Sequence, residues 1–389
     1  MSVTAARGFL ASGVKAGLKS SGEHDVALVV NQGPQFVASG VFTSNRFKAA
    51  PVLWSQQVLA DQELTAVVLN SGGANACTGP DGFADTHRTA EHLAAALARR
   101  SGQEVGAGTV AVCSTGLIGE RLPMDLLLAG VDSAVASLAA DGGQDASLAI
   151  MTTDSVPKRS VRSGAGFAIG GMAKGAGMLA PGLATMLVVI TTDAVISGEL
   201  ADAALRTATG LSFDRIDSDG CMSTNDTVLL LASGASGVQP SDEDFTALLT
   251  ELCSDLALQL IHDAEGASKD IRISVEQAAT VEDALAVGRA IARSNLLKCA
   301  LHGEDPNWGR VLAAAGTTSA QFDPDQVDVA MNGVWICRNG GLGEDRSLVS
   351  LADRQIEITV VLRAGADAAT IWTNDLTADY VHENSAYST

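Results

Sequence analysis

The stretch GAGFAIGGMAKGAGMLAPGLATMLVVITTDA, residues 164–194, carries seven glycines and a proline directly ahead of a strongly apolar run. Glycine at this density indicates unusual backbone angles or a close approach of another chain segment. The spacing G-x-G-x-x-x-G does not match a dinucleotide-binding loop, and no G-x-x-x-x-G-K-[ST] follows, so the run does not predict a phosphate site. It predicts instead a tight Pro181-Gly182 turn that places Ala184 and Thr185 at the start of a buried strand.

The rest of the chain alternates short apolar runs with amphipathic segments. The apolar runs predict buried strands at 27–30, 66–69, 109–113, 228–231, 271–275 and 356–362. Helical spacing predicts helices at 84–100, at 123–140, from Ser241 through Leu260, and from near Thr280 to Leu296. We therefore predict a mixed α/β fold of sheets covered by helices. Composition marks no domain boundary, because no repeat or low-complexity linker is visible.

Composition excludes several classes of protein. Among 389 residues, 25 Lys+Arg stand against 45 Asp+Glu, a formal net charge of −20, which leaves no basic footprint for a nucleic-acid partner. The length and the 47% hydrophobic content predict one very large domain or two interlocked ones. No run approaches the ~20 apolar residues of a membrane helix and the first residues carry no export-type signal, so we expect a cytoplasmic protein without a membrane partner.

The cysteines also argue against metal and disulfide chemistry. The six cysteines are Cys77, Cys113, Cys221, Cys253, Cys299 and Cys337. They lie far apart, with no C-x-x-C pair and no clustered histidine, which disfavours a disulfide scaffold and a zinc site. We expect reduced, mostly buried thiols and no metal.

Thr185 carries a possible chemistry of its own. A hydroxyl is a poor nucleophile without a base beside it, and no histidine neighbours Thr185 in sequence. If the Ala184–Thr185 bond breaks, Thr185 gains an α-amine with a pKa near ~8 that can serve as the base for its own hydroxyl. Attack of the hydroxyl on the Ala184 carbonyl, an N-to-O acyl shift and hydrolysis would break that bond, favoured by a strained turn. Local sequence alone also fits an ordinary buried threonine at a loop-to-strand junction.

Motifs along nearly the whole chain add a family resemblance. Residues 174–187, KGAGMLAPGLATML, resemble the self-cleavage site of the ornithine acetyltransferases, the bifunctional glutamate N-acetyltransferases of arginine synthesis, whose pattern is close to K-G-[SA]-G-M-[IL]-x-P-x-x-A-T-M-L. Further matches follow in order: NSGGANACTG at 70–79, CSTGLIGE at 113–120, IMTTD at 150–154, STNDT at 223–227, DAEGASK at 263–269, DPNWGRVLAA at 305–314 and NSAYST at 384–389. Two departures are Gly182, where a side chain such as Asn is usual, and Cys221-Met222, where Asp-Thr or Ser-Thr is more frequent.

The resemblance implies a fold and a reaction. The implied fold is the multilayer α/β sandwich shared with certain D-aminopeptidases. The precursor would be cut into an α chain, 1–184, and a β chain, 185–389, that begins with the nucleophile Thr185, and αβ units would pair as α2β2. In the implied ping-pong reaction Thr185 takes the acetyl group of N2-acetylornithine, releases ornithine and acetylates glutamate. No metal or organic cofactor is implied, and no motif decides whether acetyl-CoA is also a donor.

The resemblance also implies the site residues. The Thr115 hydroxyl and the Gly116 N–H would form the oxyanion hole, although Ser-Thr-Gly is also a common turn. The implied substrate residues are Thr152, Lys174, Thr185, Glu265, Asn384 and Thr389. A lysine and a glutamate suit an amino acid that presents a carboxylate and a side-chain ammonium.

Several residue-level alternatives remain. Either Thr152 or Thr153 could be the contact, and we choose Thr152. Glu265 is expected to close a helix, where an acid is mildly unfavourable for the helix dipole. Lys174 would by default be a solvated surface lysine, and Asp226 is either a pocket residue or, more commonly, a capping one.

Two rival functions fit the same sequence. A self-processing aminopeptidase or amidase would use water in place of glutamate as the acceptor. A binding or scaffold protein would retain the fold without cleavage.

Overall fold

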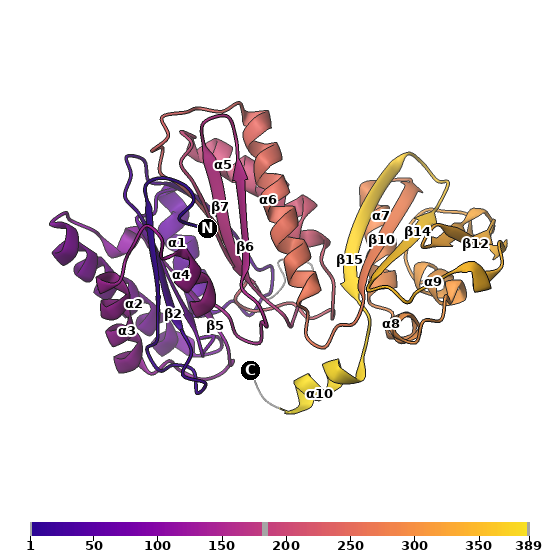
Figure 1. Cartoon of the computed structure of the whole chain (residues 1–389), viewed down its shortest axis with the longest axis horizontal. Coiled ribbons are helices and arrows are strands. Elements are labelled where there is room, and N and C mark those ends of the chain that lie inside the picture. Colours follow the sequence, from indigo (N-terminus) through magenta and orange to yellow (C-terminus); the bar gives the residue numbers. More distant parts are fainter. Residues whose placement is uncertain (1, 181–185, 387–389) are drawn as a thin grey trace.

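The computed structural model describes residues 2–180 and 186–386, which form three β-sheets and the helices that cover them (Figure 1). The first sheet has the order β1 (Phe9–Val14), β2 (Val26–Asn31), β4 (Ala66–Ser71) and β5 (Val110–Thr115). The second has the order β3 (Val37–Phe42), β9 (Thr227–Ala232), β8 (Leu187–Thr192), β7 (Ala168–Lys174) and β6 (Lys158–Ser163).

These two sheets pack face to face with helices on their outer sides. Successive side chains of β8 point to opposite faces, so Leu187 and Val189 join the core with the first sheet, while Val188 and Ile190 join the core with α5 (Gly198–Leu211) and α6 (Asp242–His262). The first sheet is covered by α1 (Ala50–Val58), α2 (Gly79–Ser101), α3 (Met124–Ala136) and α4 (Gly143–Ala149). The predicted multilayer α/β sandwich is therefore confirmed.

The third sheet forms a separate body at the right of Figure 1. Its order is β13 (Gly341–Leu342), β12 (Val334–Arg338), β11 (Asp328–Met331), β14 (Gln355–Val361), β10 (Asp270–Ala278) and β15 (Asp367–Asn374). The nearby helices are α7 (Val281–Ala292), α8 (Asn295–His302) and α9 (Trp308–Ala315), and one face of the sheet shares a core with them. After β15 the chain turns back beneath the molecule as α10 (Ala378–Ala386).

Short 3₁₀ helices complete the described chain: η1 (Leu59–Asp61), η2 (Ala107–Thr109), η3 (Phe213–Arg215), η4 (Pro324–Gln326) and η5 (Arg346–Leu348). Among the described helices, none is both long and apolar enough to cross a membrane.

The predicted strands and helices are present, with differences in three of the helices. The helix predicted at 84–100 begins five residues earlier, at Gly79. The helix expected from Thr280 to Leu296 is two helices, because the Ser294 hydroxyl accepts the N–H of Leu297 and starts α8. The helix predicted at 123–140 ends at Ala136.

The expectation of mostly buried thiols is wrong for half of the cysteines. All six are free, and Cys113, Cys253 and Cys337 are buried. The exposed three lie where the chain itself is exposed: Cys77 in a turn before α2, Cys221 in a loop and Cys299 on α8.

The predicted cleavage junction lies between two paired strands. β7 ends at Lys174 and pairs antiparallel with β8, which begins at Leu187, and these two residues are partners in the register. Ala184 and Thr185 lie outside the described residues, so the division into 1–184 and 185–389 stays a prediction. Strands from both predicted chains share the second sheet, so cleavage would leave two interlocked chains.

Candidate active site

A cavity of about 140 Å³ brings together every described residue that the sequence predicted for the site. These residues are Thr115, Gly116, Thr152, Lys174, Glu265 and Asn384. They come from five separate parts of the chain: the end of β5, the segment before β6, the end of β7, the turn after α6, and α10. Thr153 lines the cavity as well, so the choice between it and Thr152 remains open. Thr185 and Thr389 lie outside the described residues.

Thr115 and Gly116 stand at the carboxyl end of β5. The Thr115 carbonyl accepts the N–H groups of Gly72 and Gly73, each at 3.0 Å, which fixes the strand end. Gly116 has φ +128°, and a Cβ there would lie 2.6 Å from the Gly73 nitrogen, so only glycine is accommodated. The Thr115 hydroxyl accepts a hydrogen bond from Lys174 Nζ at 3.2 Å. Its own hydrogen therefore remains available to donate into the cavity.

Lys174 is not the solvated lysine that its sequence context suggested, because its side chain is buried at the end of β7. Burial lowers the pKa of the Lys174 ammonium, and the nearby carboxylate of Asp154 is the strongest opposing influence. The lysine thus presents a cation, or a proton donor, within a largely desolvated site.

Asp154 orders three neighbouring parts of the site. Its Oδ2 accepts the N–H of Thr152 at 2.9 Å, and its Oδ1 accepts the N–H of Gly175 at 2.7 Å. Oδ1 also pairs with the buried Lys158 at 2.6 Å, and Lys158 bonds Asp263 beyond the end of α6. Burial alone would raise the pKa of Asp154, but Lys174, Lys158 and the Gly175 N–H outweigh it and hold that pKa below its usual value.

Glu265 lies beyond the helix end rather than closing it. The helix α6 ends at His262, and the N–H of Glu265 donates to the carbonyl of Ala176 at 3.0 Å, so the acid is held by the loop after β7. The expected unfavourable position at a helix terminus is therefore wrong. Asn384 Nδ2 donates to Glu265 Oε2 at 2.9 Å, which brings α10 to the cavity.

Asp226 is buried and caps no helix. It precedes β9, and its Oδ1 accepts the N–H of Met186, the residue after Thr185, at 3.1 Å. Its Oδ2 is buried without a hydrogen-bond partner among the described residues. Burial raises the pKa of the Asp226 carboxyl well above its usual range, against the opposing effects of the Met186 N–H, the Ser223 hydroxyl and Lys174. A buried carboxyl with a raised pKa therefore contacts the backbone of Met186, the residue that follows the predicted nucleophile in the sequence.

Comparison with known proteins places this chain in a family. The family model of the ArgJ family matches residues 10–389. This chain belongs to the ArgJ family. "Arginine biosynthesis bifunctional protein ArgJ" of Streptomyces coelicolor is 66% identical, with 100% of both chains covered, and the protein of the same name from Thermobifida fusca is 63% identical at the same coverage. A crystal structure of ornithine acetyltransferase from Mycobacterium tuberculosis, complexed with ornithine, is 57% identical over 48% of this chain and 96% of that chain, with a TM-score of 0.44.

Five residues that line the cavity of this ArgJ-family chain were not predicted for the site from the sequence, namely Gly177, Met178, Asp219, Cys221 and Tyr380. Asp219 accepts the N–H groups of Met178 at 2.7 Å and Cys221 at 3.1 Å, and Tyr380 of α10 lies in the same wall. Burial raises the pKa of Asp219, and its two backbone donors oppose the shift. The only sequence signal was indirect, because Asp219 lies just before the Cys221-Met222 departure from the family pattern.

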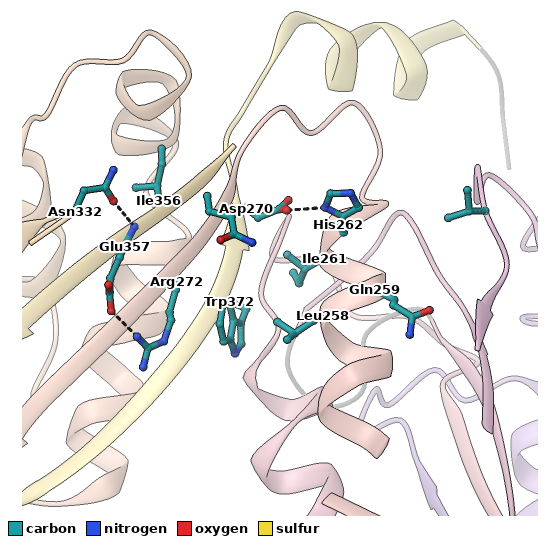
Figure 2. A pocket seen from close by; sticks show the side chains of 12 residues that line it. Leu258, Gln259, Ile261, His262, Asp270, Arg272, Asn332, Ile356, Glu357 and Trp372 are labelled. Carbon is teal, nitrogen blue, oxygen red and sulfur yellow. Dashed lines mark hydrogen bonds and ion pairs between the residues drawn. The ribbon is translucent and has the colours of Figure 1, made fainter. Parts of the chain in front are cut away.

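A larger groove of about 690 Å³ separates α6 from β10, β14 and β15, and none of the described residues that the sequence predicted for the site lines it (Figure 2). Its charged groups face one another across short distances: His262 pairs with Asp270 at 2.7 Å, and Arg272 pairs with Glu357. Figure 2 shows the Arg272–Glu357 pair across the groove from Leu258 and Ile261 of α6, while the His262–Asp270 pair joins the end of α6 to β10.

Proposed function

We propose that this chain is a self-processing ornithine acetyltransferase that passes the acetyl group of N2-acetylornithine to glutamate through an acetyl-Thr185 enzyme. The observation that carries the proposal is the convergence of six motif-borne residues on one cavity, which Gly177 and Met178 of the segment ahead of the predicted cleavage site also line. Membership of the ArgJ family supports it, since the relatives are named for arginine biosynthesis and a similar solved protein is named ornithine acetyltransferase.

The cavity offers a group for each charge that the reaction develops. Attack on the acetyl carbonyl creates an oxyanion, for which the Thr115 hydroxyl and the Gly116 N–H are the proposed donors. The Lys174 ammonium, 3.2 Å from the Thr115 hydroxyl, adds positive potential there. The Thr185 α-amine, once freed, would act as the base, so the proposal requires no metal or organic cofactor.

Two further elements of the proposal concern donors and assembly. The relatives are called bifunctional, and we assign acetyl-CoA as a second acetyl donor for glutamate. We also propose paired αβ units, α2β2, built from chains 1–184 and 185–389.

Intact-mass spectrometry tests the proposed function directly. The purified protein is expected as two chains, and incubation with N2-acetylornithine should add the mass of one acetyl group to the chain that begins with Thr185. Addition of glutamate should remove that mass and yield N-acetylglutamate. Free acetate without acetylglutamate would instead identify the amidase alternative, and an uncut chain that gains no mass would identify a binding or scaffold protein.

The C-terminal tail provides a separate test of the substrate residues. Deleting Ser388 and Thr389 should leave folding and self-cleavage intact, because β7 and β8, the strands on either side of the junction, are held in the sheet by β6 and β9. Transfer should fall at least about tenfold, since one well-placed polar contact is worth ~1.4 kcal/mol or more. The measurement is steady-state kcat/KM for N2-acetylornithine and glutamate, with His382→Ala on an exposed position of α10 as the control. Equal kcat/KM values for truncated and full-length protein would remove Thr389 from the site.

A further inference from the structure

A second chamber of about 220 Å³ adjoins the active-site cavity. The two share Asp219, Glu265 and Tyr380 as common walls. The second chamber lies where the loop after η3 meets α8 and the end of β15, so it sits between the sandwich and the third sheet. Small-molecule pockets usually exceed roughly 300 Å³ and favour such boundaries, a size that the two spaces reach only together.

Most charged groups around the second chamber already have partners. Asp217 pairs with Arg293 at 2.7 Å, and Asp375 pairs with His302 at 2.9 Å. These pairs neutralise their own charges, so they offer little to a charged ligand.

Lys298 is different, because among the described residues no carboxylate lies within ion-pair distance of it. Its side chain is buried, and Nζ donates to the Ser218 carbonyl and to Thr373 Oγ1, the latter at 3.1 Å. An ammonium has three donors, so one remains available toward the chamber. Burial lowers the pKa of Lys298 to about 8, while the groups that oppose the shift are Asp219, Asp217, Asp375 and Cys299.

Two acids complement this lysine. Asp219 accepts only backbone N–H groups, and Glu265 accepts an amide from Asn384, so neither has an ion-pair partner in the described chain. Both line the boundary between the cavity and the second chamber. The chamber therefore offers one buried cation and two acids that a ligand could pair with.

The proposed reaction needs a positive and a negative protein group in the same substrate pocket. Its first substrate ends in a side-chain ammonium and its second in a side-chain carboxylate, and in a ping-pong sequence both occupy the same pocket in turn. We propose that the second chamber receives the side-chain end of both substrates, with Asp219 facing the ammonium of N2-acetylornithine and Lys298 facing the side-chain carboxylate of glutamate. The assignment rests on the proposed function and extends it to the residues that select the substrates.

The charge of Lys298 suits this alternation. A lysine with a pKa near 8 can release its proton while an ammonium occupies the chamber, and it can hold that proton while a carboxylate does. The chamber could thus accept opposite charges without a rearrangement of the backbone.

The test separates the two half-reactions. Acetyl-enzyme formation from N2-acetylornithine is followed by mass in single turnover, and transfer from preformed acetyl-enzyme to glutamate is followed separately. Lys298→Met should raise KM for glutamate at least about tenfold and leave the first half-reaction within about threefold. Asp219→Asn should slow acetyl-enzyme formation from N2-acetylornithine at least about tenfold and leave KM for glutamate within about threefold. Lys15→Met, a matched change at an exposed lysine that lines neither cavity, is the control.

Neutral substrate analogues give a readout that a merely structural defect would not move. In Lys298→Met, the ratio of kcat/KM for glutamate to kcat/KM for glutamine as acceptor should fall at least about tenfold from its wild-type value. In Asp219→Asn, the ratio of kcat/KM for N2-acetylornithine to kcat/KM for N-acetylnorvaline as donor should fall by a similar factor. Lys298→Gln, which retains a donor toward Thr373, replaces the methionine variant if that variant does not fold.

The outcomes are distinguishable. Unchanged preferences, or equal losses in both half-reactions with normal folding, would overturn the role of the second chamber while leaving the proposed function standing. Failure of the wild-type protein to form any acetyl-enzyme would instead overturn the proposed function itself.

Discussion

Replacing Thr185 with alanine is expected to leave the precursor as one chain of 39.7 kDa and to abolish acetyl transfer. The variant lacks the hydroxyl that attacks the Ala184 carbonyl, and without cleavage no α-amine is freed to act as the base. In the wild-type protein, N-terminal sequencing of the second chain should read Thr-Met-Leu-Val-Val. Gel electrophoresis and intact mass report the cleavage, and N-acetylglutamate formation reports the transfer.

Two companion variants sharpen this result. Thr185→Ser should be cut and keep partial activity, because only a hydroxyl and an amine are required. Thr207→Ala, at an exposed position of α5, should behave as wild type. A wild-type preparation that stays a single chain would contradict the prediction, and so would an alanine variant that is still cut between Ala184 and residue 185.

Most strands predicted from the sequence lie inside a sheet, although β5 lies at an edge and the interior strands β7, β11 and β12 were not predicted. The strands β2, β4 and β9 are buried along their whole length and read as continuous apolar runs, which is the pattern of a strand covered on both faces. The edge strand β6 reads K-R-S-V-R-S and was not predicted, because half of its residues face away from the core. A single sequence carries little signal for such a strand.

The sequence of the glycine-rich run predicted only part of its local structure. The sequence predicted close approach or unusual angles, and both occur: a Cβ on Gly170 would lie 2.1 Å from the Ser2 carbonyl oxygen, and Gly175 has φ +156°. Yet 168–174 is also a regular strand, β7, because its two central glycines leave room for that approach without breaking the ladder.

The site residues likewise divide into those that the sequence could predict and those that it could not. Those carried by motifs could be named before the fold was known, and the structure collects the described ones in one cavity. Asp154 and Asp219 could not, and Asp226 could be given only as one of two alternatives, because each accepts a backbone N–H 21 to 41 residues away, at Gly175, Met178 and Met186. Such contacts exist only once the sheets are assembled, so spacing in the sequence contains no record of them.

Thr115→Ala is expected to lower kcat by roughly 10²-fold while KM stays within a few-fold. Because Lys174 donates to the Thr115 oxygen at 3.2 Å, the hydroxyl hydrogen is not used by the lysine and is available to donate into the cavity. Donors that meet an oxyanion only in the transition state affect kcat rather than ground-state binding, and the loss of one such donor costs about 10² to 10³ in rate. The measurement is the steady-state rate of N-acetylglutamate formation over a range of both substrates.

Thr115→Ser, compared with Thr115→Val, tests whether activity is lost because the Thr115 hydroxyl is missing or because the side chain that packs there has changed. Serine restores the hydroxyl that both donates into the cavity and accepts from Lys174, so it should recover most of kcat, whereas Thr115→Val keeps the shape without the hydroxyl and should match alanine. Thr109→Ala, outside the cavity at the end of η2, is the control. An effect confined to KM would move Thr115 from oxyanion stabilisation to substrate binding. Both the acyl shift at residue 184 and the acetyl transfer begin with attack of the Thr185 hydroxyl on a carbonyl, and each passes through a tetrahedral oxyanion. If the alanine variant also fails to cleave its precursor, the same pair of donors at the end of β5 therefore stabilises both oxyanions.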